Sequence, residues 1–203
     1  MLELFLKTLH KIRSEFYVKI NIIRLYHYKN IHFQRHRHPV IKGSFGLSIA
    51  KNSVIRIGNN LLISSGDNHN PLARNIQSNI TLNHGAILTI GDNVGISCSS
   101  IRCHKNITIG NNVNIGADCI IMDSDAHSIN YKDRRDSLGL DKKNKIDKPI
   151  IIEDDVLIGT RCIIMKGVTI GARSIIGAGS VVTKNIPSDC IAAGNPAKVI
   201  KYL

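Results

Sequence analysis

The stretch IEDDVLIGTRCIIMKGVTIGARSIIGAGSVV, residues 152–182, decides the fold because an aliphatic residue returns at every sixth position. The returning residues are Ile152, Ile158, Ile164, Ile170, Ile176 and Val182. Ile and Val together make up 45 of the 203 residues, so six consecutive matches would arise by chance about once in ten thousand registers. The six-residue period is therefore a true internal repeat.

Small residues accompany this ladder of aliphatic side chains. Four positions after each of the first five come Val156, Cys162, Val168, Ser174 and Ser180. The same spacing recurs upstream at Ile90, Ile96, Ile109, Ile115 and Ile121, and it fades before residue 80. Each hexad predicts a short strand followed by a corner. Because one aliphatic residue per hexad cannot form a core alone, the hexads must stack as the coils of a solenoid.

This pattern resembles the hexapeptide repeat of left-handed parallel β-helices, in which three hexads form one triangular coil. The resemblance implies three stacked pairs, Ile152 with Ile170, Ile158 with Ile176, and Ile164 with Val182, and it places Cys162 over Cys119 as small interior filler. The left hand is implied by the resemblance alone, because the general rule for parallel crossovers predicts the right hand. We expect an all-β fold with a basic helical segment at 1–45, a β-helix at 46–190 and a tail at 191–203.

Composition narrows the classes of partner and compartment. A net charge of +12 favours binding to polyanions, which include nucleic acid, anionic lipid and phosphate-bearing cofactors. No zinc-finger spacing, aromatic RNA-binding signature or basic region with heptads occurs, so no nucleic-acid partner is expected. The five cysteines, at 98, 103, 119, 162 and 190, are odd in number and lack a C-x-x-C spacing, which favours a reducing cytoplasmic compartment.

Residues 1–28 predict an amphipathic helix. Apolar residues near helical spacing are Leu2, Leu6, Leu9, Phe16, Ile20 and Ile23, with five basic residues alongside. Charged residues interrupt this segment too early for a signal peptide or a membrane span of about 20 residues. We expect the helix either to cap the open end of the solenoid or to make peripheral contact with the inner face of an anionic membrane.

The ladder breaks after Ile121. The next step should bring a small residue at 125 and an aliphatic one at 127, but the chain has Asp125 and His127. A place where a sequence violates its own pattern is where function or strain is expected. Residues 128–148 then interrupt the repeat with seven basic residues, which predicts a loop extruded from the solenoid.

The motifs around this break resemble those of sugar O-acetyltransferases of the maltose and galactoside acetyltransferase type, over about residues 80–203. The matching stretches are DAHS at 125–128, KPI at 148–150, IGT at 158–160, GAGSVVTK at 177–184 and AGNPAK at 193–198. The resemblance implies direct transfer of acetyl from acetyl-coenzyme A to a sugar hydroxyl, without an acyl-enzyme, in surface polysaccharide biosynthesis. It also implies a homotrimer with active sites between subunits.

His127 is the candidate general base. A sugar hydroxyl is too weak a nucleophile to attack a thioester unless a base takes its proton, and an imidazole can take that proton and then pass it to the departing thiolate. Asp125 would leave the same face of an extended strand and could orient the ring, or it could cap the emerging loop. No metal is expected, because a zinc carbonic anhydrase on this fold needs three histidines and only His104 and His127 are suitably placed.

The donor site is expected in the C-terminal third. By position in the matched motifs, Thr160, Ala178, Thr183 and Lys184 are similar to residues that line the donor groove, and Lys198 and Lys201 to basic residues near the adenosine phosphates. The plainer interpretation is corner geometry for Ala178 and Thr183 and a solvated tail for the two last lysines.

The acceptor is left open by the sequence. The galactoside enzymes carry a substrate-binding Asn on the coil before the catalytic histidine, whereas residues 97–100 here read SCSS. The polar segment 66–75 is unlike a hexad and is either part of an acceptor pocket or a surface turn. Acetylation of an amino sugar nitrogen and a non-catalytic solenoid scaffold remain the alternative functions.

Overall fold

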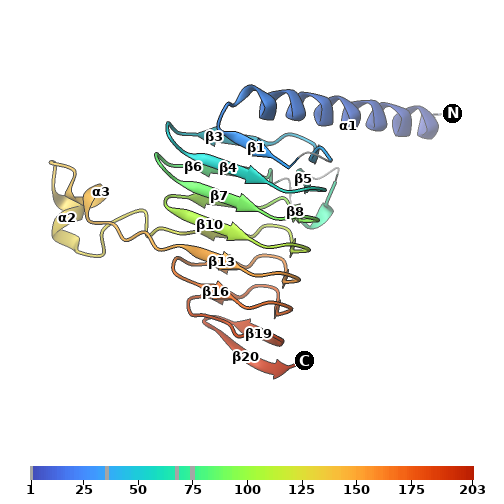
Figure 1. Ribbon diagram of the computed structural model, residues 1–203. Helices are drawn as coiled ribbons and strands as arrows, with labels where there is room; N and C mark the ends of the chain where they lie inside the picture. Colours follow the sequence, from blue (N-terminus) through green and yellow to red (C-terminus); the bar gives the residue numbers. More distant parts are fainter. Residues whose placement is uncertain (1, 35–36, 67–68, 74–75) are drawn as a thin grey trace.

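A computed structural model describes residues 2–34, 37–66, 69–73 and 76–203 of the chain (Figure 1). Parallel strands stack along one axis into a three-sided prism, α1 (Leu2–His27) lies across one end, and a long loop leaves from one side (Figure 1). This confirms the all-β class and the left-handed parallel β-helix. None of the described helices is long and apolar enough to cross a membrane.

Three sheets form the faces of the prism. Sheet A contains β1 (Ile31–Phe33), β4 (Val54–Ile57), β7 (Ile87–Ile90), β10 (Asn106–Ile109), β13 (Ile150–Ile152) and β16 (Thr169–Ile170). Sheet B contains β2 (Val40–Lys42), β5 (Leu62–Ser64), β8 (Gly95–Ser97), β11 (Asn114–Ile115), β14 (Leu157–Ile158), β17 (Ile175–Ile176), β19 (Cys190–Gly194) and β20 (Ala197–Tyr202). Sheet C contains β3 (Gly46–Ile49), β6 (Asn79–Leu82), β9 (Ser100–Cys103), β12 (Ile120–Met122), β15 (Ile163–Ile164) and β18 (Val181–Val182). The chain visits A, B and C in turn, so the prism has A/B, B/C and C/A corners.

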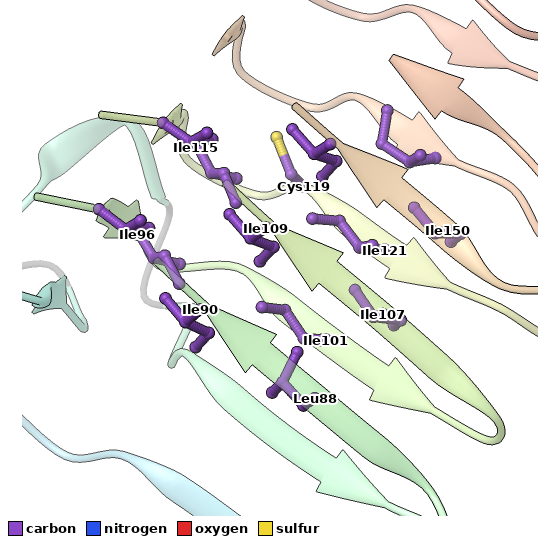
Figure 2. Packing of buried hydrophobic residues seen from close by; sticks show 14 of the residues in the cluster. Leu88, Ile90, Ile96, Ile101, Ile107, Ile109, Ile115, Cys119, Ile121 and Ile150 are labelled. Atoms are coloured by element: carbon purple, nitrogen blue, oxygen red, sulfur yellow. The ribbon is translucent and has the colours of Figure 1, made fainter. Parts of the chain in front are cut away.

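The core is a set of aliphatic columns along the prism axis. The predicted pairs are confirmed, since Ile152 lies over Ile170, Ile158 over Ile176 and Ile164 over Val182. Figure 2 shows the same stacking upstream, where Ile96 and Ile115 form one column and Ile101 and Ile121 another. Each fully buried Ile stabilises the fold by about 1.5–3 kcal/mol relative to an exposed one, so the columns supply the main favourable term. Cys119 and Cys162 lie buried in consecutive coils, as predicted.

An amide ladder holds the A/B corner. Asn60, Asn93, Asn112 and Asp155 all have positive φ, a conformation that Asn and Asp adopt more readily than most residues. Asn60 donates to Asn93 over 2.7 Å, Asn93 to Asn112 over 3.0 Å, and Asn112 to Asp155 over 2.9 Å. Side-chain hydrogen bonds therefore join four consecutive coils at the point where the backbone turns.

The strands extend beyond the expected boundaries at 46 and 190. Pairing begins at Ile31 with Ile55, and Leu47 pairs with Ile80, so the paired residues of the first coils are separated by more than three hexads. The added residues sit at the corners, and they hide the six-residue period before residue 80. At the other end, the expected tail forms an antiparallel hairpin of β19 and β20.

Helix α1 is fixed to the first coils by polar contacts. The buried Asn21 donates its side-chain amide to the carbonyls of Ile41 and Gly43 over 3.2 and 2.9 Å, and Arg24 donates to the carbonyl of Phe45 over 3.0 Å. Leu25 is buried beside them. The second half of α1 therefore covers the open end of the aliphatic columns.

Candidate functional site

The extruded loop leaves and re-enters the prism at the C/A corner through a short stalk, residues 123–125 and 146–148. Asp125 N–H donates to the carbonyl of Ile146 over 3.1 Å and Lys148 N–H to that of Asp123 over 2.9 Å, so the outgoing and returning segments pair with each other. The buried carboxylate of Asp123 also accepts the backbone N–H groups of residues 104, 105 and 106 over 2.6 to 2.8 Å. The stalk is thereby anchored to the coil above it.

The loop itself is folded and contains α2 (Tyr131–Arg135) and α3 (Leu140–Lys143). Asp133 accepts from Ser128 Oγ over 2.7 Å and from Asn144 Nδ2 over 2.9 Å, and these bonds hold the pKa of Asp133 below its usual range. Arg134 donates to the carbonyl of Ser128 over 2.7 Å. The two helices are thus tied back to the residue that follows His127.

His127 pairs with Asp141 at the base of this loop. Its Nδ1 lies 2.7 Å from Asp141 Oδ2, and the other carboxylate oxygen accepts Ser128 N–H over 2.8 Å. The contact with His127, followed by that with Ser128, lowers the pKa of Asp141, so this carboxyl is ionised at neutral pH. An ionised carboxylate only accepts, so Nδ1 carries a proton, and in the neutral ring Nε2 keeps a lone pair on a side chain that is 60% exposed. This arrangement can accept a proton from a substrate.

Asp125 does not make the contact with His127 that an extended strand would allow. Ala126 has a φ of 62°, because its N–H turns back to donate to Ser124 Oγ over 2.9 Å, so the side chains of residues 125 and 127 leave different faces. Asp125 instead forms an ion pair of 2.7 Å with Lys166 of the next coil. In this structure the expected contact of Asp125 with the ring is absent, and Asp141 makes the contact with His127 instead.

A second histidine lies under the stalk. Asn83 and Lys145 both approach Nδ1 of His104, at 2.8 and 3.3 Å, and Lys145 also pairs with Asp147. Burial, followed by the charge of Lys145, lowers the pKa of His104. A neutral ring that accepts at Nδ1 carries its proton on Nε2, and that buried nitrogen has no hydrogen-bond partner among the described residues. In the described part of the chain, no group of three or more His, Cys, Asp or Glu residues is placed to hold a metal ion.

The predicted donor residues divide between two corners. Thr160 lies between β14 and β15, and Ala178 between β17 and β18, so both are on the B/C corner. The exposed Lys198 pairs with Ala193 beside this corner, and the exposed Lys201 pairs with Ile191 toward the other end of β19. Thr183 and Lys184 follow β18 and are exposed on the C/A corner, below His127. One chain therefore presents the histidine and most of the donor residues on opposite edges of sheet C.

The polar segment 66–75 is described only in part, since residues 67, 68, 74 and 75 lie outside the described residues. A short 3-10 helix, η1 (Pro71–Ala73), packs the buried Ala73 against Cys98 and Ala117. This contact puts η1 over the B/C corner, on the coils above Thr160.

The repeat is also recognised by comparison with known proteins. Residues 106–124 and 149–184 match the family described as "Hexapeptide repeat of succinyl-transferase". The match stops at the stalk and resumes after it. The hexapeptide repeat predicted from the sequence is thereby confirmed over these residues.

Two relatives share parts of the sequence. A Schizosaccharomyces pombe protein, provisionally named an acetyltransferase, is 43% identical over 97 residues, which are 48% of this chain and 44% of the relative. The 2,3,4,5-tetrahydropyridine-2,6-dicarboxylate N-acetyltransferase of Staphylococcus aureus strain JH9 is 53% identical over 53 residues, which are 26% of this chain and 22% of the relative. The chain thus spans less than half the length of these curated relatives.

Solved structures share the fold over most of the chain. A hexapeptide-repeat acetyltransferase of Vibrio cholerae O1 biovar eltor, complexed with acetyl coenzyme A, matches with a TM-score of 0.50 and 29% identity, over 86% of this chain and 71% of that one. An N-acyltransferase of Bacillus cereus, in complex with dTDP-4-amino-4,6-dideoxyglucose and coenzyme A, matches with a TM-score of 0.63 and 21% identity, over 85% and 83%. At that identity the second match reflects the fold alone.

Proposed function

Because the chain is a hexapeptide-repeat protein that resembles the acetyltransferases of that type, we propose that it transfers an acetyl group from acetyl-coenzyme A to a hydroxyl group of a sugar. The observation that carries the proposal is the His127–Asp141 pair, since it gives an exposed imidazole with a free Nε2 beside a folded, basic loop. A scaffold would need neither the break in the ladder nor a paired, exposed histidine.

The reaction follows from the state of the two side chains. Nε2 of His127 takes the proton of the acceptor hydroxyl while the hydroxyl oxygen bonds to the thioester carbonyl carbon. The carbon–sulfur bond then breaks, and the imidazolium returns the proton to the departing coenzyme A thiolate. Asp141 holds the ring through Nδ1 and stabilises its charged form, and a positioned base of this kind contributes about 10² to 10⁴ in rate.

The donor binds along the B/C corner. Thr160 and Ala178 border the groove, Thr183 and Lys184 of a neighbouring copy line its far side, and Lys198 and Lys201 attract the phosphates. Two copies are needed to bring this corner to His127, because one chain carries the two parts on opposite edges of sheet C. The chain therefore works as a closed homotrimer with three sites between subunits. The exposed Ile129 and Leu138 of the loop are apolar surface suited to a neighbouring copy.

The acceptor is a saccharide of surface polysaccharide biosynthesis in the cytoplasm. Seven basic side chains within 128–148 favour an acceptor that carries phosphate or carboxylate. Transfer to the nitrogen of an amino sugar is the alternative, because one relative, matched over 53 residues, is an N-acetyltransferase.

The first experiment is thermal unfolding with and without saturating acetyl-coenzyme A. A ligand that binds only the folded chain raises the unfolding midpoint, so a well-folded oligomer with no shift would contradict the proposal. Coenzyme A release is then measured with neutral, phosphorylated and amino sugars. His127→Ala should abolish the release, whereas His27→Ala, at an exposed histidine on α1, should retain it. Hydroxylamine cleaves acetyl esters but not acetamides, so treatment of the product distinguishes transfer to a hydroxyl oxygen from transfer to an amino nitrogen.

A further inference from the structure

Helix α1 carries an apolar stripe that the prism leaves uncovered. Leu9, Ile12, Phe16 and Ile23 are 46%, 58%, 59% and 68% exposed. Their spacings of three, four and seven positions place them on one face of a helix with 3.6 residues per turn. Single exposed apolar residues are ordinary, but four in one line along three to four turns form a surface suited to a partner.

The opposite face of α1 does the packing. Asn21 and Leu25 are buried against the first coils, and they lie about half a helical turn away from Phe16 and Ile23. Tethering of the helix therefore fixes which face points outward. Because α1 lies across the end of the prism, as Figure 1 shows, the stripe faces away from the stacked coils. Copies joined side by side through the prism faces would leave it exposed.

Positive charge is concentrated at the same end. Residues 1–42 contain nine Lys and Arg against two Glu, so this fifth of the chain carries +7 of the net +12. On the helix, Arg13 and Lys19 are exposed on either side of the stripe, where long side chains can reach outward while their stems lie along apolar surface. Beside the last turn of α1, Arg37 and His38 line a hollow with Tyr26.

We propose that the outward face of α1 docks the protein on an anionic lipid bilayer, with the apolar stripe in the headgroup region and the surrounding cations against lipid phosphates. A helix with aliphatic and aromatic residues on one face and basic residues beside them is the form that binds in the plane of such an interface. Charge complementarity favours this occupant over a second copy, since two ends of +7 would repel each other. Docked in this way, the prism stands upright, with the C/A corner and the loop midway along its length and the C-terminal hairpin farthest from the lipid (Figure 1).

The test is co-sedimentation of the full chain with vesicles of phosphatidylcholine alone and of phosphatidylcholine with about 30% phosphatidylglycerol, an anionic lipid. Binding should require the anionic lipid and weaken with salt, because each basic residue near such a surface raises the partition about fivefold. Phe16→Glu and Ile23→Glu should each lower the partition roughly tenfold or more. The matched control is Ile200→Glu, which adds the same charge at a 66% exposed isoleucine on β20, at the far end of the prism.

Folding and assembly are followed in the same samples by circular dichroism and light scattering. Loss of vesicle binding in the two α1 variants but not in Ile200→Glu, with unchanged fold and particle mass, would support the proposal. Equal loss in all three variants, or no binding of the native chain to anionic vesicles, would overturn it. A smaller particle for Phe16→Glu in the absence of lipid would show that the stripe joins copies of the chain, and would also overturn it. None of these results depends on acetyl transfer, so the test is separate from that of the enzymatic activity.

Discussion

If His127 works on the donor corner of a neighbouring copy, two inactive variants should restore each other's activity. The two substitutions are His127→Ala, which removes the base, and Ala178→Trp, which fills the exposed B/C corner. Each homotrimer lacks one half of every site. In a mixed trimer a site works when a chain with native His127 stands next to one with native Ala178.

The magnitude follows from the arrangement of the two corners. In an equal random mixture each of the two conditions is met with a chance of one half, so about a quarter of the sites are complete. The unpurified mixture should therefore show about 25% of the native activity, although His127→Ala alone is reduced about 10² to 10⁴-fold and Ala178→Trp alone cannot bind the donor. Co-expression with two different tags and purification on both removes the homotrimers. In every trimer that remains one of the three sites is complete, so the purified sample should show about a third of the native activity. Light scattering checks that Ala178→Trp still assembles.

A second mixture separates the two possible site geometries. When the native chain is mixed equally with a chain that carries both substitutions, about a quarter of the sites work if they lie between chains, but about half work if each lies within one chain. Activity of the first mixture no higher than that of its components, together with half activity of the second, would refute the site between subunits.

Further predictions concern the His127–Asp141 pair, the buried His104, and the corner and core of the prism. Asp141→Asn should lower kcat roughly tenfold or more with little change in KM, measured by coenzyme A release, because the ring loses its orienting carboxylate. Because the pKa of His104 is lowered in the folded chain, the unfolded chain binds more protons, and the native protein loses stability as pH falls below about 6.5. The thermal unfolding midpoint of His104→Gln should therefore change less between pH of about 7.5 and about 5.5 than that of the native chain. Gly159→Ala would bring a Cβ within 2.6 Å of the Ala178 nitrogen and should lower the free energy of unfolding in urea by about 1–3 kcal/mol. Ile158→Ala, which leaves a cavity in the core, should lower it by about 2–5 kcal/mol. Its control is Ile151→Ala, at a 42% exposed position, which should lower it clearly less.

The repeat could be predicted where each coil has its minimal length. Between Ile152 and Val182 every pairing offset equals three hexads, so the period of six is visible and the stacking follows from it. Upstream, Leu88 pairs with Ile107 at an offset one position longer, and Ile101 with Ile121 at an offset two positions longer. Added residues at a corner leave the columns intact but remove the strict period, and for this reason the sequence does not reveal the first coils.

The break in the repeat at His127 could be seen in the sequence, but Asp141, which contacts the ring of His127, could not be identified there. Asp141 lies farther along the chain, within a loop that has no periodicity, and nothing in its neighbourhood distinguishes it from Asp133 or Asp136. The choice of Asp125 assumed an extended backbone, and the positive φ of Ala126 removes that assumption. A local pattern can indicate that a side chain is displaced from the core, whereas the contact it then makes depends on how the loop folds back.

The stalk has a consequence for how this chain can change. Ile115 pairs with Ile158 across the whole excursion, whereas Ile158 pairs with Ile176 only three hexads further on. The excess chain leaves and returns at one corner, so its length is independent of the register of all three sheets. A chain of this kind can gain, lose or exchange its excursion by insertion and deletion at 128–144 without altering a single column of the core. Under the proposed function, new acceptor preferences could then evolve in the excursion while the coils that carry the proposed donor groove stay unchanged.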